Sequence, residues 1–173
     1  MAIALAALHG VPLVPADDVV TGLRAMTTTQ QQPELHYWDA HPEAGEWPPA
    51  RIAQLHLSVA EVLRPAFEAI VREHAENLDP VTLEGDYLLP DFAQHPGVRA
   101  VVLAEPDTAR LVANYAAREP GPGEQRLRAE VSRLVGAELT RRASAADVPV
   151  VAAVPWRDAA DRVAAALAMA TRP

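Results

Sequence analysis

The chain contains no lysine, no cysteine and few aromatic residues, and each shortage excludes a class of chemistry. All 15 basic residues are arginine, so no mechanism that needs a lysine side chain can operate from these 173 residues. Without cysteine there is neither a disulfide nor a thiolate metal site. Aromatic residues make up only 5% of the chain, so the core has to be built mainly from alanine, valine and leucine.

Long apolar runs and an excess of positive charge are also missing. No stretch approaches the roughly 20 apolar residues of a membrane span. The apolar start, MAIALAALHG, has no positive residue ahead of it, unlike a secretory signal. We therefore expect a cytoplasmic protein of one domain. The net charge of −8 disfavours a nucleic-acid partner, because neutralising phosphates needs a basic patch.

Apolar stretches bounded by turn residues alternate with helical patterns along the chain. Strands are predicted at 11–14, 81–83, 98–103 and 148–154, and helices at 1–9, 19–26, 50–77, 107–118, 124–146 and 158–170. Pro65 should kink or divide the helix at 50–77. Strands that alternate with helices indicate parallel βαβ units, so we predict an α/β fold with a parallel sheet flanked by helices.

The stretch 80–90, PVTLEGDYLLP, is the leading candidate functional segment. Its apolar strand ends in Glu84, Gly85 and Asp86, and polar residues at the carboxyl end of a strand face the ligand crevice of an open α/β sheet. Gly85 lets a ligand or a neighbouring backbone approach closely. A buried strand that simply runs into a polar turn is an equally good interpretation of this segment alone.

Two acids, Asp17 and Asp18, follow the strand at 11–14 in the same way. One of them is expected to cap the helix at 19–26, which leaves the other available for a functional role.

The segment 27–49 is irregular and long for a loop inside a compact domain, and such loops are usually functional or mobile. We expect its aromatic residues, Tyr37, Trp38 and Trp47, to fold it over a pocket as a substrate-covering flap. The least favoured alternative is a metal hydrolase, because the spacing of the possible ligands fits no defined metal site. Those ligands are His36, Asp39, His41 and Glu43.

A second irregular segment, EPGPG at 119–123, precedes an arginine-rich helix. Arg118, Arg126 and Arg128 border it and form a lid-like region at 118–130. The alternative interpretation is a solvated helix face, in which these arginines pair with nearby glutamates. The glutamates concerned are Glu119, Glu124 and Glu130.

In this order and at this spacing, the segments resemble the P-loop kinase superfamily over nearly the whole chain. The nearest parallels are the small-molecule and nucleoside kinases related to shikimate kinase, chloramphenicol phosphotransferase and the 2-phosphoglycerate-kinase-like proteins. LAALHGVPLVPADDVV resembles the end of the first helix and the second strand with its acidic tip. VTLEGDYLLP resembles the third strand, VRAVVLAEP the fourth, NYAAREPGPGEQRLRAEVSRL the arginine-bearing lid, and VPVVAAVPW the fifth strand with the loop beside adenine.

The resemblance implies an ATP- and Mg²⁺-dependent kinase acting on a small hydroxyl-bearing or phosphorylated acceptor. An acid after the second strand would orient or deprotonate the acceptor, an acid after the third would hold the magnesium shell, and the lid arginines would offset charge on the transferred group. The implied catalytic residues are Asp17, Asp18, Arg118, Arg126 and Arg128. The implied substrate-binding residues are Arg24, Trp38, Glu84 and Asp86, and Trp156 is either an adenine-stacking residue or a plain edge aromatic.

The sequence departs from the family at the phosphate cradle, because it contains no G-x-x-x-x-G-K-[ST] motif. The family's first strand, which lies between the third and fourth, is absent as well, and two hydrophobic strands should lack their usual partner. We expect either an internal start within a longer kinase, which is favoured, or a domain that has lost nucleotide binding. Kinase activity of the chain as written should be very weak or absent. The runner-up is a non-catalytic interaction module whose exposed sheet edge pairs with another chain.

Overall fold

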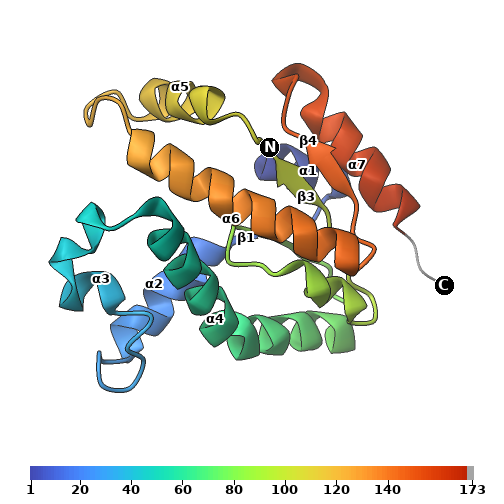
Figure 1. Ribbon diagram of the computed structural model, residues 1–173. Helices are drawn as coiled ribbons and strands as arrows, with labels where there is room; N and C mark the ends of the chain where they lie inside the picture. Colours follow the sequence, from blue (N-terminus) through green and yellow to red (C-terminus); the bar gives the residue numbers. More distant parts are fainter. Residues whose placement is uncertain (171–173) are drawn as a thin grey trace.

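The computed structural model describes residues 1–170 and contains all the predicted helices and strands in the predicted order (Figure 1). The strands are β1 (Leu13–Pro15), β2 (Thr82–Glu84), β3 (Val102–Ala104) and β4 (Val150–Ala152). The helices are α1 (Ala2–His9), α2 (Ala16–Met26), α3 (Tyr37–Ala40), α4 (Pro49–Asn77), α5 (Thr108–Arg118), α6 (Arg126–Ala145) and α7 (Ala159–Met169). Three short 3₁₀ helices are η1 (Pro42–Glu46), η2 (Pro90–Gln94) and η3 (Trp156–Asp158).

The strands form two separate parallel pairs. β1 pairs with β2 from Leu13↔Thr82 to Pro15↔Glu84, and β3 pairs with β4 from Val102↔Val150 to Ala104↔Ala152. An α/β fold with parallel strands is therefore confirmed. The strands make two small sheets in place of one, because within residues 1–170 no ladder joins β2 to β3.

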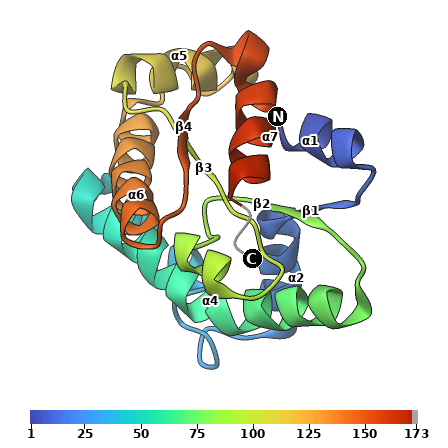
Figure 2. The ribbon, with the colours of Figure 1, turned by 90° about the vertical axis from the view of Figure 1, so that its right-hand side faces the viewer.

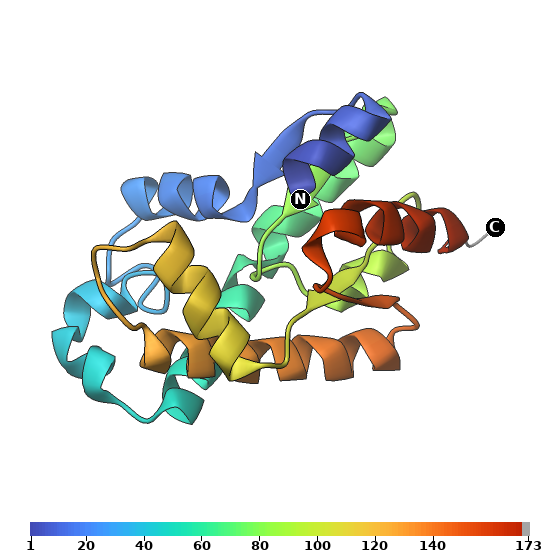
Figure 3. The ribbon, with the colours of Figure 1, turned by 90° about the horizontal axis from the view of Figure 1, so that it is seen from above.

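Helices cover the strands on two sides. Figures 2 and 3 show α6 on one side of β3 and β4, with α7 on the other. α1 lies beside α7 and contacts β1 and β2, whereas α4 packs along α6. Among the described residues, no helix is both long enough and apolar enough to cross a membrane.

The main core lies where α4 meets α6 and η2. Leu63 and Phe67 of α4 are fully buried, as is Leu89 just before η2. The Phe67 ring meets the Phe92 ring edge-on, with 6.3 Å between centroids. Edge-to-face contacts of this kind add to the free energy gained by burying the rings. This core fixes α4 as the support on which the segments after β1 and β2 rest.

Pro65 does not divide α4, which is one helix from Pro49 to Asn77. Figure 1 shows its axis turning midway, as expected where proline removes an N–H from the ladder. The prediction that Asp17 or Asp18 caps α2 is wrong. The helix begins one residue earlier, at Ala16, and Pro15 occupies the N-cap position, so both acids lie within the first turn. There they face the positive end of the helix dipole without capping it.

Candidate functional site

A cavity of about 370 Å³ lies between the carboxyl ends of three strands and the helices α5 and α6. Asp86 enters it from just beyond β2, Glu105 from the end of β3, and Trp156 from η3, which follows β4. Polar groups from the helices complete the lining: Asn114 and Arg118 from α5, and Ser132 from α6. Ligands of parallel α/β proteins bind at such strand ends, so this cavity is the candidate site.

Gly85 packs the end of β2 directly against the start of α2. A Cβ atom at Gly85 would lie 2.5 Å from the Cβ of Ala16, and the Gly85 φ of +154° suits glycine alone. The predicted close approach at Gly85 therefore occurs, and the neighbour is the first residue of α2. This contact brings the acidic ends of β1 and β2 to one edge of the molecule.

The electrostatic surroundings of Tyr87 reflect that convergence. Burial, and after it the negative charges of Asp86 and Asp17, raise the pKa of the Tyr87 hydroxyl to about 12. Arg24 acts in the opposite direction on the same group. Asp17, Asp86 and Arg24, three residues singled out from the sequence, thus share one neighbourhood.

His56 of α4 supports Asp86 from behind. Its ring lies nearly parallel to that of Tyr87, with 4.3 Å between centroids and 12° between planes. Its Nε2 is 3.4 Å from the Asp86 carbonyl oxygen and 3.5 Å from Asp86 Oδ1. Sequence reasoning missed His56, because one histidine among the residues of an amphipathic helix carries no signal of its own.

Glu105 is the second residue that sequence reasoning missed. Its side chain is only 6% exposed. Oε1 accepts the Asp107 N–H at 3.0 Å, but the buried Oε2 accepts no hydrogen bond and has only Arg110 Nη1, 3.7 Å away. An unsatisfied buried acceptor is costly, and in native proteins it frequently marks a functional position. The signal was available, since Glu105 is an acid at the end of an apolar strand, just like Glu84.

The lid-like region forms a compact network around Tyr115. The Tyr115 hydroxyl is 2.7 Å from Ser132 Oγ, and the guanidinium groups of Arg118 and Arg128 lie 5.2 and 4.3 Å from the Tyr115 ring centroid. Glu119 joins the two arginines, at 2.8 Å from Arg128 and 3.1 Å from Arg118. Hydrogen bonds from Arg128 and then Arg118 hold the pKa of Glu119 below its usual value. Of the lid arginines, only Arg118 lines the cavity.

The remaining predicted residues lie outside the cavity. Arg126 is exposed and donates from Nε to Glu124 at 2.6 Å. Arg128 pairs with Glu119. Both arginines therefore fit the alternative interpretation, a solvated helix face paired with nearby glutamates. Arg24 pairs with Asp39 at 2.6 Å. The remaining members of this group are exposed and do not line the cavity: Asp17, Asp18, Trp38 and Glu84.

The proposed metal ligands of the 27–49 segment form two separate pairs. His36 lies 3.7 Å from Asp39, and His41 lies 3.1 Å from Glu43. Nowhere in residues 1–170 do three or more His, Asp or Glu side chains gather closely enough to hold a metal ion. Mg²⁺ commonly uses only one or two carboxylates together with substrate phosphates, and the cavity offers Asp86 and Glu105 for that purpose.

The described residues do not fit the triphosphate of ATP. A cradle requires free backbone N–H groups at a helix N-terminus and a lysine. At the N-terminus of α5, beside the cavity, Asp107 already accepts the N–H groups of Ala109 and Arg110. No lysine occurs in the chain. The described residues beside the cavity therefore provide no phosphate cradle.

Comparison of the chain with protein-family models, with curated proteins and with solved structures found no significant match.

Proposed function

We propose that the protein is a P-loop-kinase-like small-molecule phosphotransferase, in which this chain supplies the acceptor side and the lid. The observation that carries the proposal is the meeting of Asp86, Glu105 and Trp156, from three successive strand ends, with Arg118 in one cavity. Acidic groups facing an arginine suit a small molecule that carries hydroxyl groups and receives or bears a phosphate.

The strand pairing supports the same proposal. In the kinases that the sequence resembles, the first strand lies between the third and the fourth. Within residues 1–170 each of the four strands pairs in parallel with a single partner, β1 with β2 and β3 with β4, so the counterparts β2 and β3 each have an unpaired edge, as β1 and β4 do. Unpaired edges on both β2 and β3 are compatible with a strand between them, and this compatibility supports the proposal.

Each cavity residue has a role that follows from its surroundings. Asp86, held by His56, accepts a hydrogen bond from the acceptor hydroxyl and orients it. Arg118 binds negative charge on the ligand. When Arg118 gives up its contact with Glu119 and contacts the ligand, the lid-like region closes over the cavity. Trp156, half exposed at the rim, offers a flat apolar face to a ring. The described residues do not cradle a nucleotide, so these roles concern the acceptor alone.

The experiment has two arms. The purified 173-residue chain should release no ADP from Mg·ATP with any of a panel of hydroxyl compounds. The DNA upstream of the Met1 codon should encode, in frame, a strand followed by G-x-x-x-x-G-K-[ST]. A stop codon close upstream with no such motif would eliminate the proposal, and so would ATP turnover by the 173-residue chain that survives in Asp86→Asn.

For this function, as for the second candidate, a cytoplasmic location stays a prediction. The second candidate function is a non-catalytic interaction module. The observation in its favour is the apolar strand β3, whose Leu103 is 37% exposed beside an unpaired edge. Unpaired strand edges are templates for pairing with another chain. Concentration-dependent association in light scattering, together with no thermal shift on adding Mg·ATP, would favour this function over the first.

A further inference from the structure

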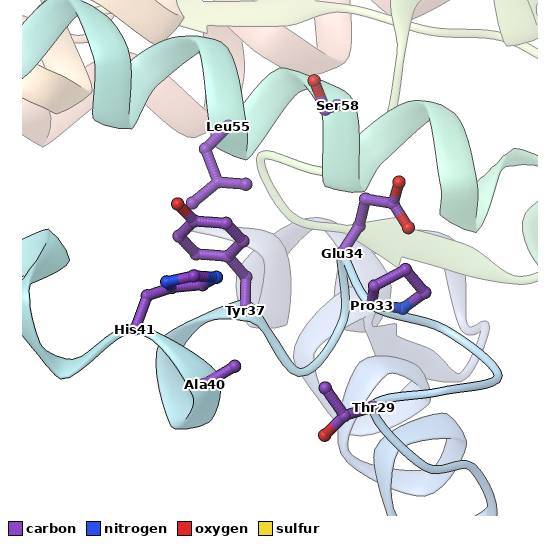
Figure 4. A pocket seen from close by; sticks show the side chains of 8 residues that line it. All are labelled: Thr29, Pro33, Glu34, Tyr37, Ala40, His41, Leu55 and Ser58. Atoms are coloured by element: carbon purple, nitrogen blue, oxygen red, sulfur yellow. The ribbon is translucent and has the colours of Figure 1, made fainter.

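A second hollow, of about 340 Å³, lies between the segment after α2 and the N-terminal half of α4 (Figure 4). Figure 4 shows the Tyr37 ring on one side of it, beneath Leu55 of α4, and the Glu34 side chain on the other. None of the residues that line this hollow lines the cavity at the strand ends. It is therefore a separate candidate site.

The carboxylate of Glu34 is the unusual group in this hollow. The residue is half-buried, and within the described chain no hydrogen bond or ion pair engages its carboxylate. A half-buried charge without a partner is unfavourable, because it loses hydration and gains nothing in return. A ligand that carries a positive charge would offset the lost hydration of the Glu34 carboxylate.

The positively charged side chains of this part of the chain already have partners, and only His41 among them lines the hollow. Arg51 lies over the Trp47 ring, 3.2 Å from its centroid, and Trp47 stands edge-on to Tyr37. Arg24 pairs with Asp39. His41 stacks on Tyr37 at 4.2 Å, and its Nδ1 faces Glu43. No arginine lines the hollow.

The hollow thus presents a carboxylate, an aromatic face and hydroxyl oxygens around an apolar floor. Ser58 donates its proton to the Gln54 carbonyl, so its oxygen remains an acceptor. Aromatic faces and carboxylates both attract organic cations, and aromatic faces are the usual means of recognising quaternary ammonium groups. The one cationic side chain that lines the hollow, His41, already faces Glu43, so an anion would find no free positive charge among the lining residues.

We propose that this hollow binds a small organic cation, with its ammonium or quaternary ammonium group between Glu34 and the Tyr37 ring. The ligand's apolar part would lie against Leu55 and Pro33. The proposal does not depend on the function assigned to the strand-end cavity, because the two sites share no lining residue.

The test uses choline, ethanolamine and 3,3-dimethylbutan-1-ol, which has the shape of choline without its charge. Isothermal titration of the 173-residue protein should show saturable binding of choline or ethanolamine, and at least tenfold weaker binding of the neutral alcohol. Glu34→Gln should weaken cation binding about tenfold, as expected for losing roughly 1.4 kcal/mol of interaction. Tyr37→Leu should weaken it to a similar extent.

Glu46→Gln is the matched control, because Glu46 is an exposed glutamate of the same segment outside the lining. It should bind like the unmodified protein. Circular dichroism establishes that each variant is folded, and Glu34→Gln keeps the test valid if Tyr37→Leu unfolds. No saturable binding of either cation would overturn the proposal, as would equal binding of the neutral alcohol or unchanged binding by Glu34→Gln.

Discussion

Arg142 of α6 donates from Nη1 to Oε1 of Glu61 on α4 at 2.5 Å and so joins the two helices that carry the main core. The same guanidinium donates from Nε to Glu138 at 2.9 Å, and Arg141 binds both oxygens of Glu138 at 2.7 Å. A network shared by several charges is more stabilising than an isolated surface pair.

This network predicts a defined response to acid. Hydrogen bonds from Arg141 and then Arg142 lower the pKa of Glu138 from 4.5 to about 2. A carboxylate whose pKa is depressed by folding stabilises the protein above its unfolded pKa and loses that contribution as the pH falls toward the folded value. Glu138→Gln should therefore lower the free energy of unfolding by about 1 kcal/mol at pH 7.

The same substitution should matter less and less between pH 4.5 and pH 2, where the native carboxylate itself becomes protonated. Urea unfolding of both proteins at pH 7, 4 and 3 measures the difference. A difference that stays constant over this range would show that Glu138 acts by packing and not by charge.

The contact of Gly85 with Ala16 predicts an asymmetric pair of glycine substitutions. Gly85→Ala places a Cβ at 2.5 Å from another Cβ, on a backbone with φ of +154°, and should destabilise the protein by about 2–4 kcal/mol. Gly22→Ala is the control. It lies inside α2, its Cβ meets nothing within 4 Å, and it should stabilise by up to about 1 kcal/mol. Thermal denaturation compares them, and equal effects of the two would contradict the close approach.

Tyr87 should titrate late among the three tyrosines. Its pKa of about 12, raised mainly by burial, predicts that one tyrosine remains protonated well above pH 10. Because the folded pKa lies above the unfolded value, the associated stability is complete below about pH 10 and is lost as the pH rises through 12. Ultraviolet titration of tyrosinate follows this directly. Tyr87→Phe should remove the late step alone, and three coincident titrations would contradict the burial.

Hydrophobic periodicity and turn residues predicted where the helices and strands lie. They did not predict which strands pair with each other, because strand pairing depends on contacts between segments far apart in the sequence. The helix predicted at 50–77 has one apolar stripe from Ile52 to Val71, and α4 follows it closely. The strand predicted at 98–103 is shortened to Val102–Ala104, because only these residues find partners on β4. Local hydrophobicity predicts that a strand is present, whereas the length of the strand depends on the strand with which it pairs.

The site was partly predictable for a similar reason. The rule that acids follow functional strands found Asp86 and would have found Glu105, since both stand just after apolar strands. It also selected Glu84, which is exposed at the register position opposite Pro15. The arginines could not be sorted from the sequence, because Arg118 and Arg126 differ only in what they contact: the cavity for one and Glu124 for the other.

The most direct test of the central claim is phosphoryl transfer by the protein translated from the complete open reading frame around this chain. With Mg·ATP and a panel of small hydroxyl compounds, ADP release should depend on the presence of an acceptor. It should fall at least about 100-fold in Asp86→Asn and remain unchanged in Asp161→Asn, an exposed acid of α7 outside the cavity. ADP release that does not depend on the acceptor, or full activity in Asp86→Asn, would rule out the proposed phosphotransferase function.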